Sequence, residues 1–289
     1  MEWKEEYAIG VEEIDKEHQG LFKAVNRLSH VLKDMDPERD RDVCKEMIKY
    51  MKSYTLKHFA DEEKYQRSIG YLDYAKHKRQ HMTFIETISY LEKDLEATNY
   101  SPASVKRLVG SLSCWLLYHV MNADQDIVGG AAHMDYEDSM SKMMQKLLIR
   151  VFQDMFYIEP EVVDGDYRGE FSGSELFCVM DFGSEDSQTR YRFFIALEEQ
   201  LALRMVGTLL GIEVREIDDL VISAVKELAN VIIVQVLDSF HNNMNFQVRR
   251  IKLIEYEEVA YYSLKADPVC SLLFSSNFGS FVIRAWRES

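Results

Sequence analysis

Proline and cysteine are scarce in this chain of 289 residues, which contains four of each. Few prolines favour long, uninterrupted helices. The cysteines, Cys44, Cys114, Cys178 and Cys270, form no CxxC pair, so we expect neither a disulfide scaffold nor a zinc ribbon. We also expect no membrane span, because charged and amide side chains interrupt the longest apolar stretch, 220–237.

Basic residues are outnumbered, with 34 Lys and Arg against 49 Asp and Glu and a formal net charge of -15. A field of this sign argues against nucleic acid or an anionic membrane as a partner. The chain starts with charged residues and has no apolar segment there, which predicts no secretory signal and a cytoplasmic protein. Hydrophobic residues make up 47%, enough for folded cores, and the length predicts about two domains.

Helical periodicity covers the first half of the chain in four blocks. The blocks are 15–33, 37–67, 73–96 and 102–126. Ser101 is placed to cap the fourth block, and Pro102 suits its first turn. Four helices with short connections predict an all-α, up-down four-helix bundle in a domain 1–130. The break at 128–133 marks the start of a linker, 131–139.

The second half, 140–289, changes to mixed periodicity and predicts an α+β domain. We expect a leading helix near 140–157 and two further helices, 198–210 and 217–240. Strand patterns cover 175–182, 190–197, 246–256, 269–275 and 281–286.

Histidines recur at helical spacing in the predicted bundle. His58 and Glu62 are four apart on the second block, and His77 and His81 are four apart on the third. His119 and Asp124 are five apart on the fourth, and His18 lies on the first. Residues four apart share a helix face. Imidazole and carboxylate without thiolate suit iron or manganese better than structural zinc, and paired metals occur in bundle cores.

A single pair at this spacing also arises by chance on an exposed face. Three pairs on consecutive helices, with a histidine on the remaining helix, favour a metal site. The other three histidines, His30, His133 and His241, have no such partner, and we interpret them as surface or linker residues.

Four segments of the first half closely resemble bacterial hemerythrins. They are GVEEIDKEH (10–18), HFADEE (58–63), HKRQH (77–81) and WLLYHVMNAD (115–124). The resemblance covers roughly residues 1–127 and implies an oxo- or hydroxo-bridged di-iron centre. In that family pattern Glu62 and Asp124 bridge the two irons. The terminal ligands are then His18, His58, His77, His81 and His119, with one iron open to dioxygen.

Four apolar residues flank these ligands and are candidates for the wall of an oxygen pocket: Phe59, Trp115, Leu116 and Val120. An apolar wall suits reversible binding, because it offers bound dioxygen neither a proton donor nor a base. For any one of them, ordinary bundle core is an equally good interpretation.

The predicted helix 217–240 carries one polar wedge in an apolar sequence. Ser223, Glu227 and Asn230 lie within about 60° on a helical wheel. One interpretation is a solvated edge on which Glu227 pairs with a neighbour. The segment is also similar to the signature helix of the CheC/CheX chemotaxis phosphatases, and with one motif copy it resembles CheX more closely.

That second resemblance implies hydrolysis of the aspartyl phosphate of a CheY-like response regulator, which brings its own magnesium. In this scheme Asn230 orients the attacking water, and Glu227 pairs with a lysine of the partner. Two departures from the family pattern weaken it: Val-Ile-Ile-Val follows Asn230 where glycine is common, and Leu253 stands in place of proline.

The combined hypothesis is an oxygen or redox sensor coupled to a response-regulator phosphatase. The alternative is an oxygen-binding hemerythrin whose second half is a non-catalytic module for docking or dimerisation. A homodimer through the second domain is compatible with either.

Overall fold

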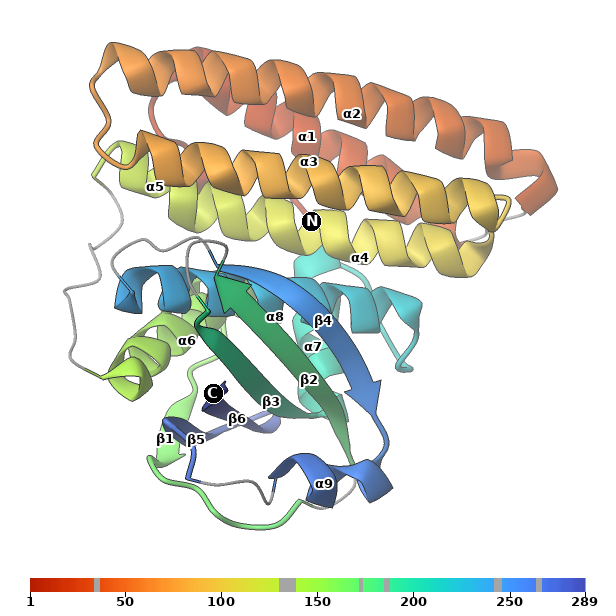
Figure 1. Ribbon diagram of the computed structural model, residues 1–289. Coiled ribbons are helices and arrows are strands. Elements are labelled where there is room, and N and C mark those ends of the chain that lie inside the picture. Colours follow the sequence, from red (N-terminus) through yellow and green to blue (C-terminus); the bar gives the residue numbers. More distant parts are fainter. Residues whose placement is uncertain are drawn as a thin grey trace. The chain divides into compact units, whose positions relative to one another are not determined.

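Figure 1 shows the computed structural model, which describes residues 1–33, 37–129, 139–171, 174–184, 188–241, 246–263 and 267–288. His133 and nearly all of the predicted linker lie outside these residues. By its contacts the chain divides into two compact units. The first comprises residues 1–133 with 206–227, and the second comprises residues 134–205 with 228–289.

The first unit contains the four helices expected from the periodicity. They are α1 (Glu12–Lys33), α2 (Pro37–Ser68), α3 (Tyr74–Ala97) and α4 (Pro102–Tyr118), preceded by a short 3-10 helix, η1 (Glu5–Tyr7). Successive helices pack side by side, and α4 also contacts α1, which closes the bundle. Large apolar side chains such as Phe22, Leu28 and Leu108 fill its interior. Residues Asp219–Glu227, the first part of α8, belong to this unit as well.

The start of α4 follows the expected capping chemistry. The hydroxyl of Ser101 accepts a hydrogen bond from the backbone N–H of Ser104 at 3.2 Å, and Pro102 occupies the first turn. The cap satisfies one of the N–H groups that a helix start leaves unpaired. It therefore fixes where the helix that carries Trp115 and leads to His119 begins.

The second unit is built on one antiparallel sheet of six strands. The strands are β1 (Glu161–Asp164), β2 (Glu175–Ser184), β3 (Arg190–Glu198), β4 (Phe246–Ile254), β5 (Cys270–Ser276) and β6 (Gly279–Glu288). Their order across the sheet is β1-β5-β6-β3-β2-β4, so β1 and β4 form the edges. The helical first part and the mixed α/β second part confirm the predicted fold class.

Helices complete the second unit. They are α6 (Met140–Phe156), most of α7 (Glu199–Leu210), the later part of α8 (Asp219–Phe240), η3 (Tyr256–Glu258) and α9 (Val259–Ser263). Phe152 of α6 stacks on Phe281 of β6 with ring centroids 4.5 Å apart, and Phe281 stacks in turn on Phe274 of β5. This aromatic row joins α6 to the sheet and contributes apolar burial to the core.

Strand β1 was not expected from the sequence. It has four residues, all exposed, and pairs with β5 at the sheet edge. Because its side chains do not alternate between core and solvent, the sequence carries no strand period there.

Helix α8 is, within the described residues, the one helix long and apolar enough to cross a membrane, with a mean hydropathy of 1.9. Half of that apolar window is buried in the structure. A buried core helix has the same length and composition, so this feature is weak evidence for a membrane span.

Candidate functional site

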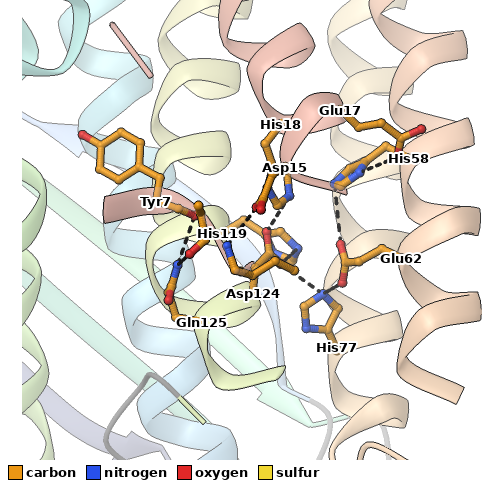
Figure 2. A network of polar contacts seen from close by, with 12 residues as sticks. Tyr7, Asp15, Glu17, His18, His58, Glu62, His77, His119, Asp124 and Gln125 are labelled. Carbon is orange, nitrogen blue, oxygen red and sulfur yellow. Dashed lines mark hydrogen bonds and ion pairs between the residues drawn. The ribbon is translucent and has the colours of Figure 1, made fainter. Parts of the chain in front are cut away.

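The histidines and carboxylates expected to bind metal meet inside the first unit (Figure 2). They come from α1, α2 and α3, from the π-helical turn His119–Ala123 that continues α4, and from the short α5 (Asp124–Ile127). None is more than 3% exposed: His18, His58, Glu62, His77, His81, His119 and Asp124. The structure therefore brings together all seven residues selected by spacing and resemblance.

Their ligating atoms form two groups. In the first, the Nε2 atoms of His77 and His81 are 3.1 Å apart, and those of His81 and His119 are also 3.1 Å apart. In the second, the rings of His18 and His58 lie with centroids 4.6 Å apart. Each group, together with Glu62, has its ligand atoms close enough to hold one metal ion.

The two carboxylates lie between the groups. Glu62 is 2.7 Å from Nε2 of His77 and 3.5 Å from Nε2 of His58. Asp124 is 3.0 Å from Nε2 of His119 and equally 3.0 Å from Nε2 of His18. Each carboxylate thus faces a histidine of both groups, the arrangement that bridging of two metal ions requires.

The polar atoms of this cluster are not satisfied by the protein alone. Within the described residues, both ring nitrogens of His18, both oxygens of Asp124 and one oxygen of Glu62 are buried and form no hydrogen bond of good geometry, although imidazole nitrogens lie 3.0 Å from Asp124. Burial would raise the pKa of Glu62, but the neighbouring His77 and His81 hold it well below its ordinary range. Buried carboxylates without compensation are costly. Five imidazoles and two carboxylates therefore fit two cations, which would pair with these atoms.

A π-helical turn explains how His119 and Asp124 reach the same site. Residues five apart on an α-helix point about 140° away from each other. The segment His119–Ala123 is instead a π-helix, and the backbone N–H of Asp124 donates to the carbonyl of His119. That turn returns Asp124 to the face of His119. The sequence pattern placed both residues correctly but did not show that a π turn was needed.

Two glutamates support the ligands from outside and were missed in the sequence. Glu17 lies 3.2 Å from Nδ1 of His58, and Glu63 lies 3.3 Å from Nδ1 of His81. The contact with His58 lowers the pKa of Glu17 to about 2, although burial opposes the shift. Such contacts fix which ring nitrogen faces the metal. Each glutamate adjoins a ligand in the sequence, which was the available signal.

A further residue, Gln66, donates a short hydrogen bond to Glu62 from one turn along α2. Gln66 is completely buried, and its own amide oxygen has no hydrogen-bond partner within the described residues. It therefore orients the bridging carboxylate.

The residues expected to wall an oxygen pocket divide into two sets. The rings of Phe59 and His81 stack with centroids 3.7 Å apart, and those of Trp115 and His119 with centroids 4.3 Å apart. Both aromatic residues therefore cover the group formed by His77, His81 and His119, the three-histidine group. Trp115 and Leu116 also line an apolar cavity of about 20 Å³, whereas Phe59 and Val120 do not. This cavity is lined as well by Leu21, one turn from His18, and by Thr55, one turn from His58.

The polar wedge of α8 is less exposed than a solvated edge would be. Ser223 is 8% exposed and Glu227 is 9% exposed, and Asn230 is half-buried. Burial raises the pKa of Glu227 to about 7, and no cation pairs with it among the described residues. The amide oxygen of Asn230 is buried without a hydrogen-bond partner.

Within the first unit, α4 packs closely against the beginning of α8. A Cβ atom at Gly110 would lie 2.5 Å from the carbonyl oxygen of Leu220, so only glycine allows this approach. Lys106 pairs with Asp218 at 2.6 Å, and Arg107 pairs with Asp219 at 2.9 Å. Burial and the nearby Glu227 raise the pKa of the Cys114 thiol. The same helix thus reaches both the histidine cluster and Glu227.

Two of the remaining histidines are described. His30 is exposed on α1, as expected. His241 is half-buried, and its Nε2 lies 2.8 Å from the hydroxyl of Tyr191. Its interpretation as a simple surface residue was incomplete, because the partner lies 50 residues away in the chain.

Comparison with known proteins bears on the first unit most directly. Residues 9–129 match the family described as the hemerythrin HHE cation binding domain. The bacteriohemerythrin of Clostridium acetobutylicum is 30% identical over 129 residues, which are 44% of this chain and 97% of that protein. The myohemerythrin of Theromyzon tessulatum is 28% identical over 123 residues, 43% of this chain and 87% of that protein.

Solved structures similar to about half of the chain include chemotaxis proteins. CheX of Vibrio vulnificus shows 17% identity and a TM-score of 0.40, covering 52% of this chain and 99% of that chain. A chain of the Borrelia burgdorferi complex of CheX with CheY shows 15% identity and a TM-score of 0.43, covering 53% and 100%.

We expect the purified protein to hold two metal ions per chain, because two groups of buried ligands share two carboxylates. His77→Ala should lose at least one ion, since no spare histidine lies in its group. His30→Ala is the matched control, an exposed histidine on α1 that should leave the content at two. Elemental analysis measures both variants, and a content of one in the unaltered protein would contradict the two-metal site.

The buried Glu227 predicts a pH-dependent effect on stability. Its folded-state pKa of about 7 exceeds the ordinary value of 4.5. Below pH 4.5 the folded and unfolded chains both carry the proton. As pH rises to 7, only the unfolded chain ionises, so stability falls by up to about 3 kcal/mol.

Glu227→Gln should not show this loss of stability. Its free energy of unfolding, measured by denaturant titration, should rise relative to the unaltered protein between pH 4.5 and 8. Glu216→Gln removes an exposed carboxylate nearby and should give a flat difference. A flat difference for Glu227→Gln as well would show that Glu227 is solvated.

Proposed function

The chain belongs to the hemerythrin family, and we propose that it is a cytoplasmic di-iron sensor of oxygen or redox state that controls dephosphorylation of a CheY-like response regulator. The observation that carries this proposal is the position of α4. It leads into His119 at one end of the first unit's ligand cluster and packs against the beginning of α8, which bears Glu227.

The donor set supports iron as the metal. Nitrogen and carboxylate oxygen ligands without thiolate suit iron, and a bundle core with bridging carboxylates is a known setting for a di-iron site. Two irons held there would supply dioxygen binding or a change of oxidation state. The chain's own contribution is to hold the histidine rings through Glu17 and Glu63 and the bridge through Gln66.

The apolar cavity supports dioxygen as the ligand. Its volume of about 20 Å³ has room for one small molecule, because a single water needs about 10–15 Å³. Its lining residues Leu21 and Thr55 lie one turn from His18 and His58, and the group of these two histidines has fewer protein ligands, which would leave a position for dioxygen. Its lining carries few polar groups that could deliver a proton.

Asn230 supports phosphatase chemistry in α8. Hydrolysis of an aspartyl phosphate requires a water in line with the phosphorus–oxygen bond that breaks, and the partner supplies the magnesium and the carboxylate that leaves. The buried amide oxygen of Asn230 has no hydrogen-bond partner among the described residues, so once this face of α8 is uncovered it can accept a hydrogen bond from that water. Glu227 would pair with the partner's lysine.

Burial of Glu227 supports regulation. A carboxylate that is 9% exposed and packed near α4 cannot reach a partner until the beginning of α8 separates from α4. Trp115 directly follows Cys114 on α4 and stacks on His119, so a shift of the His119 ring on ligand binding bears directly on α4. Dioxygen would change the output only by binding the closed and open states with different affinity.

The same burial favours one alternative. If Glu227 never becomes accessible, the protein binds oxygen, and the second part acts as a docking or dimerisation module. The apolar Val-Ile-Ile-Val after Asn230 and Leu253 in place of proline are consistent with this alternative.

Asn230→Ala should lower the rate of dephosphorylation by on the order of 10²-fold, because positioning of the water is lost. Binding of the receiver should change little, since the amide acts mainly on the transition state. Glu227→Ala should instead weaken association. Loss of acyl phosphate from a phosphorylated receiver measures the rate, and calorimetry measures binding. Unchanged hydrolysis in Asn230→Ala would favour the docking module.

Removing the ion pairs between α4 and α8 should release Glu227. The double variant Lys106→Ala and Arg107→Ala should raise the dephosphorylation rate several-fold and reduce its dependence on the iron state. Lys23→Ala with Lys93→Ala removes two exposed charges from the bundle and is the matched control. Rates are compared for reduced, oxygenated and oxidised protein. Equal rates in the three states of the unaltered protein would contradict the coupling.

A further inference from the structure

Four arginines gather on one part of the sheet in the second unit, in a chain whose net charge is -15. They line an open cavity of about 580 Å³ at the end of β2, the start of β3, the middle of β4 and the end of β6. The arginines are Arg190, Arg192, Arg249 and Arg250. Two carboxylates, Asp181 and Glu288, share the cavity.

Both carboxylates are engaged by the same arginine. Nε of Arg192 lies 2.6 Å from Asp181, and its Nη1 lies 3.2 Å from Glu288. Arg190, Arg249 and Arg250 are exposed and form no hydrogen bond or ion pair with any residue in the described part of the chain. Three positive charges thus face one cavity without an acidic partner among the described residues, an arrangement that an anion would stabilise.

The backbone of β4 is shaped to place two of them there. Asp181 of β2 pairs with Arg250, but the next residue, Phe182, pairs with Val248, so the ladder has a bulge at Arg249. Neighbouring residues of a regular strand point to opposite faces. The bulge re-aims one side chain, and Arg249 and Arg250 consequently both line the cavity.

One residue that lines the cavity, Gly183, has no side chain. Gly183 pairs with Arg190 on β3, and a Cβ atom there would lie 3.2 Å from Nε of Arg249. A Cβ atom would require the Arg249 side chain to shift by a few tenths of an ångström, and the larger branched side chain of valine would take up more of this space. Glycine keeps the space between the guanidinium groups open.

From this geometry we propose that the cavity binds a small anion of the phosphate class with at least two negative charges, such as a pyrophosphate or a nucleotide phosphate chain. Guanidinium groups match phosphate oxygens in pairs of parallel hydrogen bonds. The volume lies within the range of small-molecule sites. This site shares no residue with the metal cluster or with the polar face of α8, so its test does not depend on the proposed function.

The test is calorimetric titration of the metal-loaded, full-length protein with pyrophosphate, ATP and citrate at about 0.15 M ionic strength, where exposed charges are screened. Pyrophosphate and ATP should bind at one site per chain. Arg249→Gln with Arg250→Gln should weaken binding at least tenfold. Arg150→Gln with Arg168→Gln removes two charges elsewhere in the second unit and should change it less than twofold.

A variant that keeps every charged residue distinguishes binding in a cavity of defined shape from attraction by the positive charges alone. Gly183→Val adds a side chain suited to a strand and should weaken binding as strongly as loss of the two arginines. Thermal melting verifies that it folds. Binding that survives Gly183→Val, or that falls equally in the control pair, would overturn the proposal. Failure of both pyrophosphate and ATP to bind would also overturn it. That holds even if an acidic receiver domain binds the protein and this binding requires Arg249 and Arg250.

Discussion

Burial of seven ionisable side chains in one bundle core is the constraint on which the first unit depends. Five imidazoles and two carboxylates occupy positions that apolar side chains would fill in an ordinary bundle. Their cost is offset only if cations pair with atoms that the protein leaves unpaired, such as both oxygens of Asp124. Metal binding and folding of this unit are therefore expected to be linked. The apolar layers around Leu28 and Leu108 must hold the helices in the register that brings the seven ligands together.

The same constraint shapes α4 and its continuation. A regular α-helix cannot direct both His119 and Asp124 into the cluster, and the π turn between them solves that problem. On the preceding helix, Trp115 stacks on both His119 and Phe84. On its other side Gly110 allows the backbone to approach the beginning of α8. A ligand-induced shift of His119 would thus act on a helix with contacts on both sides.

Charge is distributed unevenly for a chain that is so acidic. Among the described residues, Glu227 is buried without a cation, whereas Arg190, Arg249 and Arg250 are exposed without an anion. Burial of Glu227 costs desolvation, and the exposed arginines repel one another, and a ligand or partner of opposite charge would relieve both. The two features differ in what completes them: a cationic partner group for Glu227 and an oxyanion for the arginines.

Much of this protein was predictable from the sequence, because helical spacing and ligand chemistry are local properties. The four helices, the seven candidate ligands and the wedge of Ser223, Glu227 and Asn230 all follow from periodicity or from motifs. The tertiary structure decided what depends on distant residues. It showed that Glu17 and Glu63 hold ligand rings, that α4 covers Glu227, and that a bulge at Arg249 groups arginines from separate strands. The physical reason is that burial and electrostatic pairing depend on neighbours brought together only by folding, which no spacing along the chain records.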